Sequence, residues 1–196
     1  MKPSLAVIDP PWLWKAYSSK GEDRSPKYNR MTLADISRLP IYDLMADNSV
    51  VMLWVVDPLL HQALKIVNDW GFTFKTVGFY WTKHKPSGAD HMGGGYYTRA
   101  NPEQCWVLTK GKGLPRVSRS VRRWMHAPVG RHSEKPEEFF IRTQQLFGFI
   151  EEKVEIFGRA PREGWTVLGE EIDGEDIFDS LASYKESVTS PCILRT

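Results

Sequence analysis

The sequence has few cysteines and no apolar run long enough to cross a membrane. Only two of its 196 residues are cysteine, Cys105 and Cys192, which excludes a disulfide framework and offers no pattern for a structural zinc site. The longest apolar run, residues 50–56, is far shorter than the roughly 20 residues that span a bilayer. A lysine and three prolines interrupt residues 1–12, so this segment lacks the apolar core of a signal peptide. We therefore expect a cytoplasmic protein with no bound metal and no membrane contact.

An excess of one charge is also missing. Lysine and arginine number 26 and aspartate and glutamate 24, so the net charge is only +2. With 41% hydrophobic and 12% aromatic residues, the composition excludes a disordered or uniformly polyionic chain. The length fits one domain with its own hydrophobic core.

Charge is nevertheless distributed unevenly along the chain. Between residues 110 and 135 a single acid, Glu134, stands among eight bases: Lys110, Lys112, Arg116, Arg119, Arg122, Arg123, Arg131 and Lys135. This segment predicts contact with a polyanion, with Arg122 and Arg123 as candidate phosphate-binding residues, although a solvated loop is the alternative. From residue 170 to the end seven acids oppose two bases, and we expect residues 170–196 to form a solvated, partly mobile acidic tail.

Apolar runs and helical patterns alternate along the rest of the sequence. Buried strands are expected at residues 5–8, 49–56, 72–83, 103–109 and 153–157, and helices at 32–38, 57–70 and 133–149. In the second helix Leu60, Leu64 and Val67 are expected to share the buried face. This alternation predicts an α/β fold with a largely parallel sheet, in which ligands bind beyond the carboxyl ends of the strands.

The first of these strand ends carries Asp9-Pro10-Pro11-Trp12. The two prolines fix the backbone and lack N–H donors, so a carboxylate and rigid carbonyl oxygens stand together as acceptors beside a flat ring. Such a group of acceptors suits the exocyclic amine of a nucleobase, whose nitrogen lone pair is delocalised into the ring until acceptors bind its hydrogens. The alternative is a rigid turn with a core tryptophan.

A second strand end with candidate functional residues carries Phe157-Gly158-Arg159. Gly158 allows close approach of a ligand to the backbone, Arg159 offers a guanidinium for a ribose or carboxylate, and Glu155 offers a carboxylate for ribose hydroxyls. Lys135 opens a predicted helix, where backbone N–H groups favour an anion. Each of these residues also has an ordinary alternative as a surface or ion-pair residue.

Several segments in order resemble one family of enzymes. The landmarks span residues 6–169 and comprise Asp9-Pro-Pro-Trp12, Tyr28-Asn-Arg-Met-Thr32, Leu53-Trp-Val55, Trp70-Gly-Phe72, Trp81-Thr-Lys83, Glu103-Gln-Cys105, His132-Ser-Glu-Lys-Pro136, Glu155-Ile-Phe-Gly-Arg159, Gly164-Trp165 and Leu168-Gly169. They resemble the family of the catalytic subunit of the messenger-RNA adenosine-N6 methylase (the MT-A seventy family), in its prokaryotic or phage form.

The resemblance implies a Rossmann-like fold that binds S-adenosylmethionine and methylates the N6 amine of adenine, with residues 1–169 as the catalytic domain. Asp9, Pro10, Pro11 and Trp12 would be catalytic. The implied cofactor-binding residues are Ile8, Asp9, Pro10, Lys135, Glu155, Phe157, Gly158, Arg159 and Glu170. The implied substrate-binding residues are Trp12, Tyr28, Glu103 and Lys135, joined by Arg122 and Arg123 from the basic segment.

One departure and three alternatives accompany this resemblance. Glu170 stands where the family has an asparagine that binds the cofactor ribose, so the donor of the carboxamide is lost. A compact chain resembles the bacterial or phage DNA enzymes, which favours DNA over RNA as substrate. A catalytically silent nucleic-acid-binding scaffold is the third alternative. A homodimer stays open, because flipping a base out of a duplex without an extra domain can call on a second copy.

Overall fold

Seven strands form one sheet in the computed structural model, which describes residues 1–14, 30–130 and 134–189. The sheet order is β5-β3-β4-β2-β1-β6-β7. In chain order the strands are β1 (Leu5–Ile8), β2 (Ser49–Val55), β3 (Thr73–His84), β4 (Glu103–Lys110), β5 (Trp124–Pro128), β6 (Lys153–Ile156) and β7 (Thr166–Leu168).

Within this sheet β4 is antiparallel to both of its neighbours, β2 and β3, and every other pairing is parallel. The amino end of β4 therefore lies at the same edge as the carboxyl ends of the other strands. This arrangement confirms the predicted α/β, Rossmann-like fold with a largely parallel sheet.

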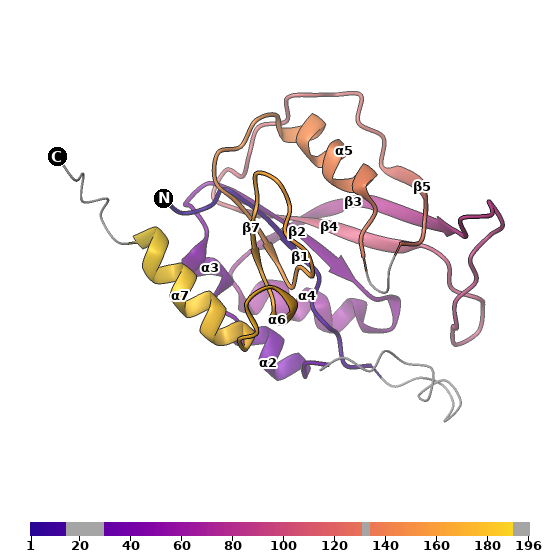
Figure 1. Cartoon of the computed structure of the whole chain (residues 1–196), viewed down its shortest axis with the longest axis horizontal. Coiled ribbons are helices and arrows are strands. Elements are labelled where there is room, and N and C mark those ends of the chain that lie inside the picture. Colours follow the sequence, from indigo (N-terminus) through magenta and orange to yellow (C-terminus); the bar gives the residue numbers. More distant parts are fainter. Residues whose placement is uncertain (15–29, 131–133, 190–196) are drawn as a thin grey trace.

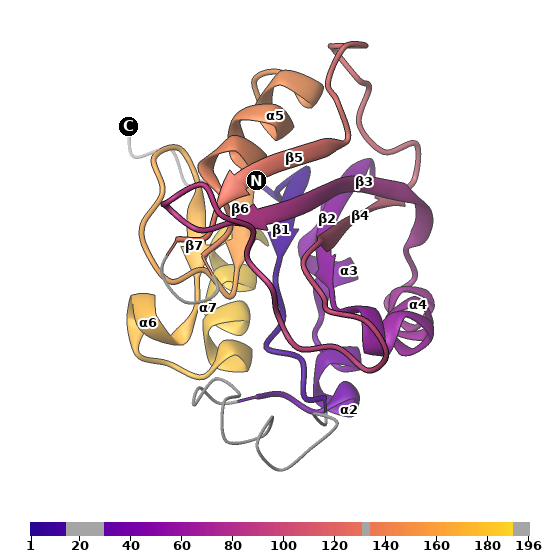
Figure 2. The same ribbon diagram turned by 90° about the vertical axis from the view of Figure 1, so that its right-hand side faces the viewer.

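Helices cover both faces of the sheet (Figures 1 and 2). Helix α5 (Glu137–Phe147) covers one face, while α2 (Leu33–Ser37), α3 (Ile41–Leu44), α4 (Leu60–Asp69) and α7 (Ile177–Thr189) cover the other, and α6 (Glu170–Asp173) follows β7. In β1, Leu5 and Val7 point to the α5 side and Ala6 and Ile8 to the opposite side, so each face has its own core. All four residues of β1 are buried, as expected for a central parallel strand.

Two of the three predicted helices begin close to their predicted starts, whereas α5 begins at Glu137 rather than at residue 133, and α3, α6 and α7 were not predicted. Thr32 caps α2 by accepting a hydrogen bond from the Asp35 backbone N–H at 3.1 Å. The helix predicted from residue 57 starts as a short 3₁₀ turn (Asp57–Leu59) and continues as α4. Its buried face contains Ala63, Ile66 and Val67, whereas Leu64 is 41% exposed. The expectation that Leu64 faces the core is therefore wrong.

The carboxyl-terminal segment differs most from its sequence prediction. Residues 170–189 contain α6 and α7, and α7 buries Ile177, Leu181 and Tyr184 in the same core as β1 and β6. The expectation of a solvated, partly mobile end is thus wrong for this part of the chain. The acids lie largely on the outside of these helices, and the apolar spacing of α7 holds them against the fold.

The basic segment does not present all its charges to solvent. The Lys110 ammonium is buried and donates to the carbonyl oxygens of Tyr42 and Met45, each at 2.9 Å. Lys135 is likewise buried, at the site described below. The exposed bases of the segment among the described residues are Lys112, Arg116, Arg119, Arg122 and Arg123. In the described part of the chain, no helix is both long and apolar enough to cross a bilayer.

Candidate active site

A cavity of about 540 Å³ opens at the edge of the sheet where the parallel strands end. This size falls within the roughly 300–1,000 Å³ of small-molecule sites. Its walls come from the segments that follow β1, β2, β5, β6 and β7, from the end of β3, from the start of β4 and from the residues before α5. They include Asp9, Pro10, Pro11, Trp12, Arg30, Trp54, Trp81, Lys83, His91, Glu103, Glu134, Lys135, Phe157, Gly158, Arg159, Gly169 and Glu170.

The register of the sheet places Asp9 in this cavity. Ile8 pairs with Leu53 on β2 and with Ile156 on β6, so Asp9 begins the turn between two neighbouring strand ends. The turn is held by the backbone: the Trp12 N–H donates to the Pro10 carbonyl at 2.8 Å, and the Met31 N–H donates to the Pro11 carbonyl at 2.9 Å. A carbonyl oxygen has two lone pairs, so Pro10 keeps the capacity to accept a second hydrogen bond.

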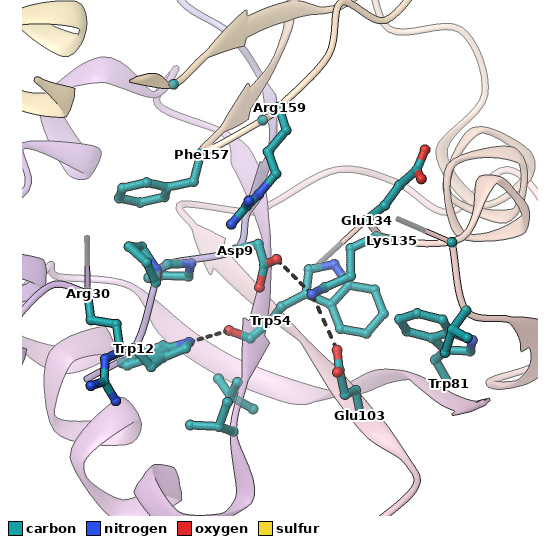
Figure 3. Close-up of a pocket in the computed structure, with 18 of the residues that line it drawn as sticks. Asp9, Trp12, Arg30, Trp54, Trp81, Glu103, Glu134, Lys135, Phe157 and Arg159 are labelled. Carbon is teal, nitrogen blue, oxygen red and sulfur yellow. Dashed lines mark hydrogen bonds and ion pairs between the residues drawn. The ribbon is translucent and has the colours of Figure 1, made fainter. Parts of the chain in front are cut away.

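Four charged side chains alternate in sign across the floor of the cavity. The Lys135 ammonium lies 2.7 Å from Asp9 Oδ2 and 3.3 Å from Glu103 Oε2 (Figure 3). Lys83 extends the chain, with its ammonium 2.8 Å from Glu103 Oε1. We call Asp9, Lys135, Glu103 and Lys83 the charge chain. Two carboxylates and two ammonium groups balance, so these charges can be held in a low-dielectric setting.

Burial and neighbouring charges both shift the pKa values of the side chains in the charge chain. Burial raises the pKa of Asp9, and Lys135 opposes that rise. Burial would likewise raise the pKa of Glu103, but Lys135 and Lys83 hold it at about 2. Burial would lower the pKa of Lys135, but Asp9 and Glu103 raise it above its ordinary value, so Lys135 is an ammonium at neutral pH. Trp54 adds a further contact, with its ring centroid 5.0 Å from the Lys135 ammonium.

Trp12 is held differently from what a base-stacking role requires. Its indole N–H donates to the Trp54 carbonyl at 3.0 Å, and only 5% of the residue is exposed. It borders the cavity, yet most of its ring packs in the core on the α4 side of the sheet. This burial favours the interpretation of Trp12 as a core tryptophan that fixes the Asp9 turn.

Two glycines, Gly158 and Gly169, line the cavity just after β6 and β7. Phe157 has a φ of +69°, which turns the chain sharply after β6. A Cβ on Gly158 would lie 2.2 Å from Val167 Cγ1, and a Cβ on Gly169 would lie 2.3 Å from the Gly158 carbonyl oxygen. Only glycine fits at either place, because an added methyl group would meet the protein's own atoms where the ends of β6 and β7 pack together.

The remaining predicted cofactor residues divide between the wall and the interior. Arg159 and Glu170 line the cavity, and Arg159 also donates to Glu171 at 2.8 Å. Ile8 is fully buried in the core. Glu155 is not among the lining residues: it accepts from Arg162 at 3.0 Å, and burial raises its pKa. The predicted role of Glu155 toward a ribose thus gives way to an ion pair with Arg162.

The predicted substrate residues are also divided. Glu103 and Lys135 meet at the charge chain. Arg122 and Arg123 lie just before β5 and are exposed, outside the cavity lining. Tyr28 lies outside the described residues.

Sequence reasoning missed the cavity roles of Lys83, Trp54 and Trp81. Trp81 and Lys83 are two residues apart near the end of β3, and both line the cavity. The signal in the sequence was a charged residue at the end of a largely apolar strand. His91 was missed as well. It lies in the loop after β3, where Asn101 accepts from the Lys83 N–H at 2.6 Å and donates to the Lys83 carbonyl at 2.8 Å.

Comparison with known proteins agrees with this geometry. The sequence model of the MT-A70 family matches residues 3–171. The chain is 32% identical to the type II methyltransferase M.MunI of a Mycoplasma species over 154 residues, which are 77% of this chain and 62% of that protein. It is 26% identical to the N(6)-adenine-specific methyltransferase METTL4 of Mus musculus over 184 residues, 85% of this chain and 36% of that protein. The chain thus spans less than two thirds of either relative. Because the family match covers most of its length, the chain belongs to the MT-A70 family of methyltransferases.

Proposed function

We propose that this protein transfers a methyl group from S-adenosylmethionine to the N6 amine of adenine in DNA. The observation that carries the proposal is the position of Asp9: it lines the cavity together with Pro10, at the carboxyl edge of the sheet. The family match and the two methyltransferase relatives support the same chemistry.

The walls of the cavity fit S-adenosylmethionine. Gly158 and Gly169 line the cavity without side chains of their own, and Phe157 offers an apolar ring. Arg159 can pair with a carboxylate, and Glu170 can accept from ribose hydroxyls. When bound, S-adenosylmethionine would supply an electrophilic methyl group on a positively charged sulfur.

Asp9 and Pro10 would then prepare the attacking amine. An ionised carboxylate has about four acceptor positions, so the hydrogen bond from Lys135 leaves Asp9 able to accept from an amine. Two acceptors on the amine hydrogens return electron density to nitrogen, which forms the new bond to carbon as the carbon–sulfur bond breaks. The amine must also lose a proton, and Asp9 is placed to hold it.

Lys135 and Glu103 act on the reaction through Asp9, which Lys135 contacts directly. The ammonium lowers the pKa of Asp9 against the larger effect of burial, and Glu103, which also contacts Lys83, contacts the ammonium on its other side. The charge chain fixes the Asp9 carboxylate in place before substrate binds, so little reorganisation is needed at the moment of transfer.

DNA is favoured over RNA by the similarity to M.MunI, a type II methyltransferase, over 77% of the chain. The exposed Arg122 and Arg123 would neutralise phosphates, and binding should weaken as salt rises. A base in a duplex must leave the stack to reach a cavity of this kind, at a cost of a few kcal/mol.

The test is transfer of an isotopically labelled methyl group to DNA and to RNA of the same sequence, followed by mass spectrometry of the nucleosides. We expect N6-methyladenine in DNA. Asp9→Ala should lower the rate of transfer at least about a hundredfold, the usual scale for a lost preorganised contact, while calorimetry shows S-adenosylmethionine binding largely retained. Methylated product in RNA alone would show that the substrate is RNA and not DNA. Equal turnover by Asp9→Ala would remove Asp9 from the mechanism, and absence of both S-adenosylmethionine binding and transfer would favour a silent scaffold.

A further inference from the structure

A stack of aromatic rings lies on β3 and β5, outside the cavity. The ring centroids of Trp124 and His126 are 6.0 Å apart and their planes differ by 20°. The His126 ring is in turn 4.6 Å from that of His84. We call Trp124, His126 and His84 the aromatic stack. Along β5, Met125 and Ala127 point into the core under α5, so Trp124 and His126 face the other way.

Trp124 is exposed, yet its ring is fixed in place. The residue is 60% exposed. Its indole N–H donates to Thr82 Oγ1 at 2.9 Å, and the Thr82 hydroxyl donates to the Met125 carbonyl at 2.9 Å. A large exposed ring that is already ordered loses little entropy on binding, which is a property of recognition residues rather than of incidental surface.

The strand that carries Trp124 is held from its open side. Arg142 on α5 donates to the carbonyl oxygens of Arg122 at 2.8 Å and Trp124 at 2.6 Å. These bonds fix the backbone on either side of Arg123. The aromatic stack therefore stands on a rigid strand, although β5 is the edge of the sheet (Figure 1).

Basic residues flank the aromatic stack, and the stack leads toward the cavity. Arg122 and Arg123 precede Trp124 and are exposed, as is Lys85, which follows His84. At the other end of β5, Val129 and Gly130 line the cavity, as does Lys83, the neighbour of His84. β3 and β5 run side by side toward that edge (Figure 2). Cationic side chains beside exposed rings are the combination that binds a nucleic-acid backbone together with its unpaired bases.

We propose that the aromatic stack binds single-stranded nucleic acid by stacking on its bases, while Arg122 and Arg123 neutralise the phosphates. This rests on the proposed function, because it assigns a surface to the substrate of the neighbouring site. In a duplex the flat faces of the bases are covered by one another, so a fixed indole ring can stack only on a base that has left the helix. The surface therefore selects unpaired nucleotides next to the target adenine.

The test separates base stacking from charge. Fluorescence anisotropy measures the binding of an oligothymidylate of about 16 nucleotides and of an abasic oligomer with the same number of phosphates. Trp124→Ala should weaken oligothymidylate binding roughly 5- to 100-fold and leave abasic binding unchanged. Trp124→Phe, which keeps a smaller aromatic ring and loses the bond to Thr82, should retain more oligothymidylate affinity than Trp124→Ala does. The double variant Arg122→Ala, Arg123→Ala should weaken both oligomers and lower the salt dependence.

Phe149 provides the matched control. It is 85% exposed and lies between α5 and β6, a strand that β3, β4, β2 and β1 separate from β5 in the sheet, so Phe149→Ala should leave both affinities unchanged. Where Trp124→Ala is too unstable by thermal melting, Trp124→Leu keeps apolar bulk without a ring and should show the same selective loss. Oligothymidylate affinity equal to the wild type in Trp124→Leu, or an equal loss for the abasic oligomer, overturns the aromatic stack as a base-binding surface. Methyl transfer by the wild type would still stand in that case, so the two failures are distinguishable.

Discussion

Lys135 lies in the segment whose bases were expected to contact phosphates, yet its ammonium is buried between Asp9 and Glu103. Its side chain is only 8% exposed, so the charge acts inside the protein. Net charge along a sequence window does not distinguish a buried ion pair from a surface patch, because both use the same residue types. Lys110, another base of that window, is also buried and holds the carbonyl groups at the end of α3.

Lys135→Met should change the pH dependence of transfer. Burial already raises the pKa of Asp9, and removing the ammonium removes the main effect that lowers it. The carboxylate would then be protonated at higher pH. The acid limb of the pH profile of kcat/KM should therefore shift to higher pH, and activity at neutral pH should fall. Lys135→Arg keeps the charge and should move the limb less.

Stability provides the second measurement on Lys135→Met. Removing one partner of a buried ion pair costs about 3–5 kcal/mol, which denaturant unfolding at neutral pH resolves. A folded Lys135→Met protein with an unchanged pH profile would show that Asp9 does not depend on this ammonium.

At the scale of elements, the direction of β4 determines which residues reach the site. Its antiparallel course brings Glu103, at its first position, to the edge where β1 and β3 end. With a parallel β4 the last residue, Lys110, would lie there instead. The sequence predicts the strand but not its direction, because an apolar run has the same pattern in either orientation.

The contact between the ends of β6 and β7 gives a prediction at the same scale. A methyl group on Gly169 would meet the Gly158 carbonyl, which is backbone and cannot rotate away. Gly169→Ala should therefore displace this wall and weaken S-adenosylmethionine binding by roughly tenfold or more, about 1.4 kcal/mol, measured by calorimetry.

Gly94 is the matched control for this substitution. A methyl group there meets nothing within 4 Å, so Gly94→Ala should bind S-adenosylmethionine as the wild type does. Wild-type affinity in Gly169→Ala would mean that the cofactor does not use this wall.

At the scale of the whole molecule, the burial of α7 indicates that this helix is part of the cooperatively folded unit. Leu181 is completely buried, and a buried Leu→Ala change costs about 2–5 kcal/mol. We expect Leu181→Ala to lower the free energy of unfolding by that amount, whereas Ser183→Ala, at an exposed position on the same helix, should be neutral. Chemical denaturation compares the two. Equal stability of both variants would mean that α7 is not part of the cooperative fold.

Much of this architecture could be predicted from apolar patterning. A short apolar run that stops at two prolines predicts both the strand at Leu5–Ile8 and the turn after it that carries Asp9. β5 and β7 were not predicted because they are short and carry few inward residues: β5 buries only Met125 and Ala127. The apolar spacing of Ile177, Leu181 and Tyr184 was present, but the surrounding acids obscured it.

The candidate site was predicted in part for similar reasons. Strand ends identify Asp9 and Gly158, because backbone direction follows from the strand that precedes them. Side-chain partners do not follow from local sequence: Glu155 pairs with Arg162, and Trp12 turns into the core. Those contacts depend on how distant segments pack together.

The bonds from Arg142 to the carbonyl groups of Arg122 and Trp124, just before and at the start of β5, have a consequence for the protein in concentrated solution. A bare terminal strand offers unpaired peptide groups that another molecule can extend into a continuous intermolecular ribbon. Here a guanidinium occupies two of those acceptors. The protein can thus keep an open strand for a ligand and still resist edge-to-edge aggregation.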